Sequence, residues 1–271
     1  MEARGAPTAA LEFAAWLRPP GWPLLAERDR RRVRVLSLVA IAAQLLFFAG
    51  WIVAGALEPG YSAQRQAISE LGAGTAAHPW ILNLALGIWG AGFVALGAAM
   101  VPGLRGRPWG RVAPALFVIA GAATALAGAV RLDCEPNGDH LCAAREASGS
   151  LSLAHYAHLW LSVVMVLGVL ATPFALARAE WPSRLARLTL AGGAGSAILW
   201  FLSTVAIHGG HSHDGLYQRV GLGLMSYWVL LIAATLLLET NPGWTAAVAA
   251  VSDRFARTTS PGSGTPRPSR P

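Results

Sequence analysis

The sequence predicts an all-α protein, a membrane bundle of six transmembrane helices with both termini in the cytoplasm. Its composition is the first reason. Hydrophobic residues make up 54% of the 271 residues and charged residues only 13%, whereas about 25% of the residues of an ordinary soluble domain are charged. The second reason is that the apolar residues form long runs with short polar segments between them. Lipid is therefore the expected solvent for most of this chain.

The apolar runs number six, and each is roughly 20 residues or longer, enough for a helix to cross about 30 Å of hydrocarbon. Helices are expected because lipid offers no partners for exposed backbone groups. The predicted spans are residues 35–57, 80–101, 112–131, 153–177, 188–207 and 219–238. Together they form a transmembrane domain over residues 35–238. Residues 1–34 are predicted to be an irregular cytoplasmic segment, and residues 239–271 a cytoplasmic tail, largely disordered because it is rich in Ser, Pro, Gly and Thr.

The arginines set the predicted orientation. All 21 basic residues are arginines, and they gather before the first span, in the 102–111 and 178–187 connections and after the last span. Arg65, Arg131, Arg145 and Arg219 are the exceptions. The positive-inside rule places the arginine-rich side in the cytoplasm of a multi-pass cell-membrane protein. The net charge of +7 is thus explained by topology, and membrane lipids, not nucleic acid, are the expected partners.

Small residues recur at the spacing that lets helices approach closely. The pairs are Gly50 with Ala54, Gly121 with Ala125, and Gly192 with Ser196. Three polar residues near the middle of spans, Gln44, Asn83 and Thr124, are predicted to join helices. No Asp, Glu or Arg lies near the middle of a predicted span, which is not typical of an ion-coupled transporter.

The first outer loop begins with a turn at Pro59-Gly60. A short interfacial helix is predicted to follow, capped by Ser62 and anchored by Ile68 and Leu71, with Arg65 and Glu70 facing water or a cleft. A binding role for Ser69 and Glu70 is the alternative.

The second outer loop contains Asp133 and both cysteines of the chain. Pro136-Asn137-Gly138 predicts a tight reversal between Cys134 and Cys142, and this side of the membrane permits oxidation. A disulfide is favoured, and free thiols or metal ligation are the alternatives.

Histidines mark two further places. His155 and His158 open the fourth span at a spacing of three, which puts them on neighbouring positions of one helix face. Structural hydrogen bonding and a metal or catalytic site are both open for this pair. The third outer loop offers the richest set of metal ligands, with zinc as the ion that imidazole and carboxylate suit; the set is His208, His211, His213 and Asp214. No HExxH helix fixes its geometry, so adventitious and enzymatic binding stay open.

Several of these residues resemble a known family pattern. They are Gly60-Tyr61-Ser62, the block from Ile68 to Gly72, Asp133-Cys134-Glu135-Pro136, His155 and Gln218-Arg219. Together they are similar to the six-span bacterial and archaeal membrane family known as domain of unknown function nine-nine-eight, over about residues 35–238. The Ile-Ser-Glu element is also distantly similar to the DRAM and FRAG group, whose members are associated with lipid organisation. The resemblance implies the topology but no reaction, and the histidine-rich third loop is not part of the pattern.

The leading hypothesis is a polar pocket at the extracytoplasmic face that binds a lipid headgroup or small amphiphile. Its predicted residues are Arg65, Ser69, Glu70, Asp133, His155 and Arg219. Arg219, where the sixth span enters the membrane, is expected to pair with Glu70, Asp133 or a lipid phosphate.

Two other hypotheses remain. One is a metal-dependent intramembrane hydrolase of a lipid amide or ester, with Glu70, Asp133 and His155 as candidate catalytic residues and zinc held by histidines. The other is a non-catalytic scaffold or assembly subunit whose outer polar residues lock the loops together. Assembly into a homo-oligomer is compatible with each.

Overall fold

The six predicted spans are helices in the computed structural model of this chain, which describes residues 25–135, 139–181, 183–208, 214–247 and 250. The long helices are α2 (Glu27–Leu57), α3 (Pro79–Met100), α4 (Val112–Ala129), α6 (Leu153–Glu180), α7 (Arg184–His208) and α8 (Asp214–Glu239). Each is long and apolar enough to cross a membrane. Two short helices, η1 (Ile68–Gly72) and α5 (His140–Ala147), lie in the connections.

Helix α2 begins at Glu27 and not at residue 35, so the basic cluster predicted to be an irregular flank forms the first turns of the helix. Arginine is a strong helix former, and no Pro or Gly interrupts the chain here. The ion pair between Arg30 and Glu27, 2.9 Å apart at a spacing of three, adds to this turn. Of the tail predicted over residues 239–271, residues 242–247 are helical, and residues 251–271 lie outside the described part of the chain.

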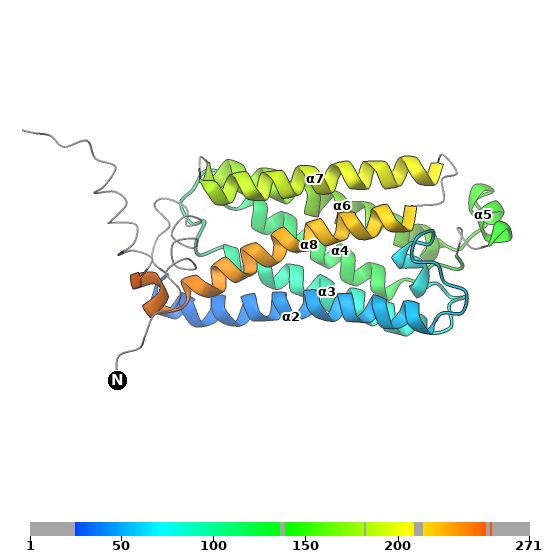
Figure 1. Cartoon of the computed structure of the whole chain (residues 1–271), viewed down its shortest axis with the longest axis horizontal. Helices are drawn as coiled ribbons and strands as arrows, with labels where there is room; N and C mark the ends of the chain where they lie inside the picture. Colours follow the sequence, from blue (N-terminus) through cyan, green and yellow to red (C-terminus); the bar gives the residue numbers. More distant parts are fainter. Residues whose placement is uncertain (1–24, 136–138, 182, 209–213, 248–249, 251–271) are drawn as a thin grey trace, which may run out of the picture.

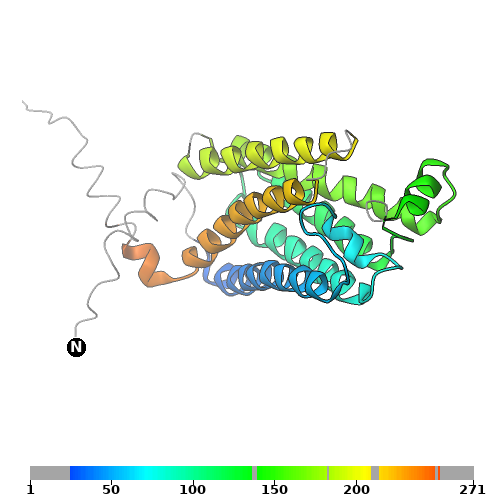
Figure 2. The same cartoon turned by 45° about the vertical axis from the view of Figure 1, so that its right-hand side comes forward.

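The long helices form a closed ring. Each packs against the next in the sequence, and α8 returns to pack against α2. Figures 1 and 2 show the six helices running roughly alongside one another, with α2 and α8 side by side although they are the first and last spans. A ring of this kind brings the connections at each end of the bundle close together.

Aromatic side chains fill the centre of the ring. Phe47 of α2 stacks on Trp89 of α3 with ring centroids 3.9 Å apart, and Phe93 continues the row at 4.8 Å from Trp89. Phe117 of α4 lies 5.8 Å from Phe93 and 5.7 Å from Trp228 of α8. These rings are almost fully buried, so four helices share one aromatic core.

Gln44 and Thr124, two of the polar residues predicted to join helices, form different contacts. Gln44 joins three helices as predicted, because it accepts from Trp89 Nε1 and donates to Ser226 Oγ, each at 2.9 Å. The prediction for Thr124 was wrong, since its hydroxyl donates to the carbonyl of Ala120 in its own helix at 2.7 Å. A threonine can satisfy its hydroxyl on the preceding turn without a second helix.

Candidate functional site

Most of the residues singled out in the sequence lie at one end of the bundle, on the right in Figure 1. We call it the loop end, and it comprises residues 58–78, residues 131–135 and 139–152, and the first turns of α6 and α8. The 101–111 connection, the end of α6 and the start of α7 lie at the opposite end.

Arg219 of α8 clamps the first loop. Its Nη1 donates to the carbonyls of Ala63, Gln66 and Gly215 at 2.6, 2.9 and 2.9 Å. Its Nη2 donates to the Tyr61 hydroxyl. The sequence predicted a carboxylate or phosphate partner for this guanidinium, whereas the hydrogen bonds that the structure shows go to backbone carbonyls and to a phenol. Arg219 therefore has a positioning role.

Further contacts extend this clamp. The Arg219 guanidinium lies 5.4 Å from the ring centre of Trp51 and 5.5 Å from that of Tyr61, within the range of cation–π attraction. The neighbouring Gln218 accepts from the Ile68 amide at 2.7 Å. Burial raises the pKa of the Tyr61 phenol, the Arg219 charge opposes that rise, and the carboxylates of Glu70 and Glu135 add to it.

Glu70 is buried, with 2% of its surface exposed, so of the two predicted surroundings, water or a cleft, the structure excludes water. It lies in η1, which packs against α2, α3 and α8, so helices cover more than one face of this short segment. The predicted anchors Ile68 and Leu71 are buried too. Asn83 of α3 donates to the Gly72 carbonyl at 3.1 Å, so it holds the loop and does not join two spans. Ser69 is half-buried beside these residues.

The first loop also differs locally from the prediction. Ser62 caps no helix; its carbonyl accepts from the amides of Arg65 and Gln66 in a turn, at 3.0 and 2.8 Å. The side chain of Gln66 accepts from the Ser62 amide at 2.8 Å. Helix η1 then begins at Ile68 without a side-chain cap.

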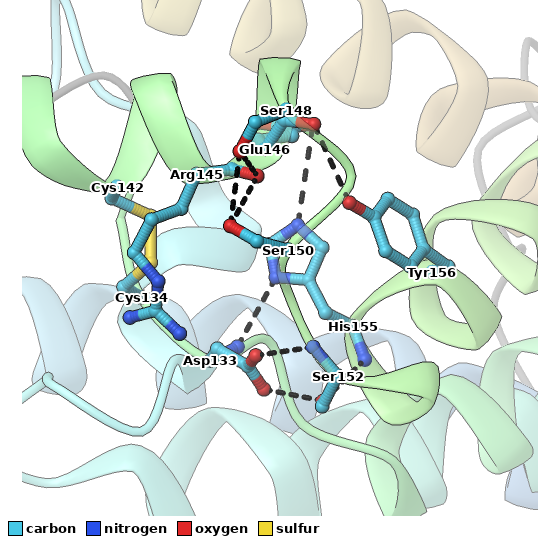
Figure 3. A network of polar contacts seen from close by, with 10 residues as sticks. All are labelled: Asp133, Cys134, Cys142, Arg145, Glu146, Ser148, Ser150, Ser152, His155 and Tyr156. Atoms are coloured by element: carbon cyan, nitrogen blue, oxygen red, sulfur yellow. Dashed lines mark hydrogen bonds and ion pairs between the residues drawn. A yellow bond between two sulfur atoms is a disulfide. The ribbon is translucent and has the colours of Figure 1, made fainter.

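A second cluster lies at the start of α6, shown in Figure 3. The carboxylate of Asp133 accepts from the backbone N–H of Ser152 at 2.7 Å and from its hydroxyl at 2.6 Å. The Ser152 hydroxyl in turn caps α6 by accepting from the His155 amide at 3.2 Å. The bonds from Ser152 lower the pKa of Asp133. Asp133 thus stays ionised below the usual aspartate range and holds the helix start.

The hydrogen bonds of His155 and His158, in the first turns of α6, indicate which ring nitrogen carries the proton. His155 Nδ1 accepts from the Asp133 amide at 3.2 Å, so the proton of the neutral ring lies on Nε2, which is 4.0 Å from a Glu146 oxygen. His158 Nδ1 lies 2.9 Å from the carbonyls of Ala127 and Val130, so it carries the proton, because carbonyls only accept. The pair therefore has separate structural partners, and His158 joins α6 to the end of α4.

The predicted disulfide between Cys134 and Cys142 is present, with Cα atoms 5.9 Å apart. Both cysteines are buried against Leu151 and Tyr156. The predicted reversal at residues 136–138 lies outside the described residues. Asp139 caps α5 by accepting from the Leu141 amide at 2.8 Å.

We expect the double substitution of Cys134 and Cys142 by serine to lower the free energy of unfolding by about 2–3 kcal/mol, the chain-entropy value for a loop this short. Thermal unfolding of detergent-purified protein measures the difference. Wild type treated with reductant serves as a control and should unfold at the temperature of the double variant. Equal unfolding temperatures of oxidised and reduced wild type would contradict the assignment.

Metal binding receives no support from the part of the chain that the structure describes. No group of three or more His, Cys, Asp and Glu residues is placed there to hold an ion. His211 and His213 lie outside that part, and the side chains of His208 and Asp214 are not described. The zinc hypothesis on this loop therefore stays a prediction.

A polar cavity of about 490 Å³ opens at the loop end. Its lining comes from two loops and consists of Glu58, Pro59, Gly60, Arg65, Gln66, Thr75, Glu135 and Asp139. Of the predicted pocket residues only Arg65 lines it. The sequence analysis did not predict Glu58 and Glu135 as site residues. The acidic residues of both loops, together with Arg65, could have indicated them.

The carboxylates of Glu58 and Glu135 in this cavity repel each other. Gln66 donates to Glu135 at 3.3 Å, and Glu58 accepts from the Ala77 amide at 2.7 Å. Burial raises the pKa of Glu135, and the negative charge of Glu58 raises it further. A cation placed between the two would offset this repulsion.

The closed ring of six apolar helices, with polar loops gathered at one end, defines an integral multi-pass membrane protein. The chain belongs to the family described as Protein of unknown function (DUF998), whose model matches residues 41–235. That range includes both polar clusters and the cavity. No curated protein and no solved structure compared with the chain matches it.

Proposed function

We propose that this protein binds the headgroup of an aminophospholipid, a lipid with both a phosphate and a primary ammonium, in the cavity at the loop end. The observation that carries the proposal is the presence of the Arg65 guanidinium and the Glu58 and Glu135 carboxylates on the walls of one cavity. The arginine-poor character of this end favours an extracytoplasmic position, and the ligand would come from the outer leaflet.

The chemistry of the walls matches both charges of such a headgroup. A guanidinium donates parallel hydrogen bonds to phosphate oxygens. The ammonium would lie between Glu58 and Glu135, where it offsets their repulsion. The volume of about 490 Å³ is within the range of about 300–1,000 Å³ for small-molecule sites.

The class of ligand is the one the sequence predicted, but the proposed roles of the residues differ. Arg219 binds the Gln66 carbonyl, and Gln66 donates to Glu135, so Arg219 supports a wall of the cavity. Asp133 lies two residues before Glu135 in the sequence and accepts hydrogen bonds from Ser152. We infer that these two predicted site residues position the cavity and do not contact the ligand.

Binding of phosphatidylethanolamine and of phosphatidylcholine, whose quaternary ammonium cannot donate hydrogen bonds to the carboxylates, to the detergent-purified protein, counted by native mass spectrometry, tests the proposal. Wild type should prefer phosphatidylethanolamine about tenfold. The double variant Glu58→Gln/Glu135→Gln should lose this preference, and Arg65→Gln should weaken binding of both lipids about tenfold. The matched control Arg131→Gln, an exposed arginine at the same end, should stay within about twofold of wild type. Equal binding of both lipids by wild type would refute the proposal.

The pH dependence of the same measurement gives a separate prediction. Because the pKa of Glu135 is raised, its carboxyl takes up a proton at higher pH than an ordinary glutamate, whose pKa is about 4.3. Protonation removes the charge that would hold the ammonium. Affinity for phosphatidylethanolamine should therefore decline as the pH falls, starting above that value, and Glu135→Gln should show a flatter profile. Identical profiles for wild type and variant would contradict the role of Glu135.

The scaffold hypothesis is the second candidate. It is favoured by Arg219, whose described hydrogen bonds join the first loop to α8. A scaffold predicts no difference between the two lipids and no effect of Arg65→Gln, so the same titration separates the two functions.

A further inference from the structure

A groove at the opposite end of the bundle is basic. It has a volume of about 1270 Å³ and lies where α3 ends, α4 begins and the 101–111 connection joins them. Among the described residues that line it are four arginines, Arg32, Arg105, Arg107 and Arg111, and no Asp or Glu. From these observations we propose that this groove binds one anionic phospholipid of the leaflet facing the arginine-rich end. The inference is independent of the function proposed for the loop end.

Two of the four positive charges are already compensated by this chain. Arg105 pairs with Asp29 at 3.0 Å, and Arg107 pairs with Glu180 at 3.2 Å. Arg32 and Arg111 are exposed and make no ion pair with another described residue. The groove therefore has a net positive charge that a phosphodiester would complement.

The apolar part of the groove fits acyl chains better than a soluble anion. Val101, Val118 and Ile119 line it and are exposed on the outer surface of α3 and α4, where lipid tails would lie. The volume exceeds the roughly 1,000 Å³ upper range of small-molecule sites, which leaves room for a headgroup and the first part of its chains. A phospholipid combines both chemistries in one molecule.

The connection that forms the wall is held in a defined conformation. Trp109 has a φ of 65°, a region that bulky residues rarely adopt, and its carbonyl accepts from the Val112 amide at 2.9 Å. A Cβ on Gly110 would lie 2.2 Å from the Leu104 carbonyl oxygen, so the backbone is closely packed here. Trp109 itself is 55% exposed and lines the groove, in the way that interfacial tryptophans meet headgroups.

Titration of the full-length, detergent-purified protein with palmitoyl-oleoyl phosphatidylglycerol, followed by native mass spectrometry, tests this site. The double variant Arg32→Gln/Arg111→Gln should weaken binding of this lipid about tenfold. Each juxtamembrane arginine contributes about fivefold to the affinity for an anionic lipid, and glutamine retains part of that contribution through hydrogen bonds. The matched control Arg34→Gln/Arg187→Gln removes the same charge from exposed arginines that do not line the groove, and should change affinity less than twofold. Neither double variant breaks an ion pair between described residues, and equal unfolding temperatures would verify their folding.

A second readout places the lipid. Quenching of tryptophan fluorescence by phosphatidylglycerol brominated on its acyl chains should decrease in Trp109→Phe relative to wild type. Equal loss of affinity in both double variants would overturn the site in favour of general surface charge. Equal binding of phosphatidylcholine would overturn its anionic selectivity, and displacement of the lipid by an equal concentration of inorganic phosphate would show a soluble-anion site instead.

Discussion

Replacing Arg219 by glutamine is expected to release the first loop from α8 and to lower the free energy of unfolding by about 3 kcal/mol. The guanidinium donates to three carbonyls and to Tyr61, and hydrogen bonds to a charged donor contribute about 1.5–3 kcal/mol each when their partners cannot turn to water. Glutamine is too short to reach all four oxygens. Lysine should rescue little, because a single ammonium cannot reproduce the planar fork.

Trypsin provides the most direct measurement of this release. The chain contains no lysine, so the enzyme can cut this loop only after Arg65, which lies between the Ala63 and Gln66 carbonyls bound by Arg219. In Arg219→Gln, cleavage after Arg65 should be at least ten times faster than in wild type. Arg131→Gln is the control, because Arg131 is exposed at the same end and should leave the rate unchanged.

Gly215 gives an independent check on the same contact. A Cβ at this position would lie 2.4 Å from the Gln66 carbonyl oxygen, 2.8 Å from that of Ala63 and 2.9 Å from Arg219 Nη1. Gly215→Ala should therefore also expose the loop, by displacing the contact without removing the guanidinium. If neither variant is cut faster after Arg65, the loop is held by η1 alone and the positioning role of Arg219 is lost.

The fold could be predicted from the sequence because the membrane imposes a simple rule. Any long apolar run must become a helix that satisfies its own backbone, and each of the six runs did. Helix ends were less predictable. The start of α2 at Glu27 shows that charged residues extend a helix beyond the apolar run, since hydropathy measures the preference for lipid and not the helix itself.

The candidate site was predicted at the correct end of the bundle but with different inner contacts. Ile68 and Leu71 were recognisable as anchors by their apolar side chains. The burial of Glu70 was not, because it depends on α2, α3 and α8 meeting around η1. The partners of Arg219 are backbone carbonyls, which every residue carries and no sequence pattern marks. The cavity is likewise built from two loops whose proximity follows from ring closure.

The second large effect is expected where α3 crosses α4. A Cβ on Gly90 would lie 2.4 Å from the carbonyl oxygen of Gly121, and a Cβ on Gly121 would lie 2.5 Å from that of Gly90. The two backbones are thus in direct contact, in the close approach that the small residues Gly121 and Ala125 predicted. Either Gly→Ala substitution should lower the free energy of unfolding by about 3 kcal/mol, the upper range for overpacking, because no side-chain rotation relieves a contact with backbone. Unfolding by denaturing detergent, followed by circular dichroism, measures this.

Gly87→Ala is the matched control on the same helix. A Cβ there would meet no atom within 4 Å, and alanine is favoured over glycine within a helix by roughly 0.5–1 kcal/mol. Stability should therefore stay the same or rise slightly. The contrast matters because α3 and α4 also contribute Trp89, Phe93 and Phe117 to the aromatic core. Separation of these helices would disturb the core as well as the crossing, so a full loss of folded protein in Gly90→Ala fits the geometry. Equal stability of the Gly87 and Gly90 variants would mean that the helices cross farther apart than described.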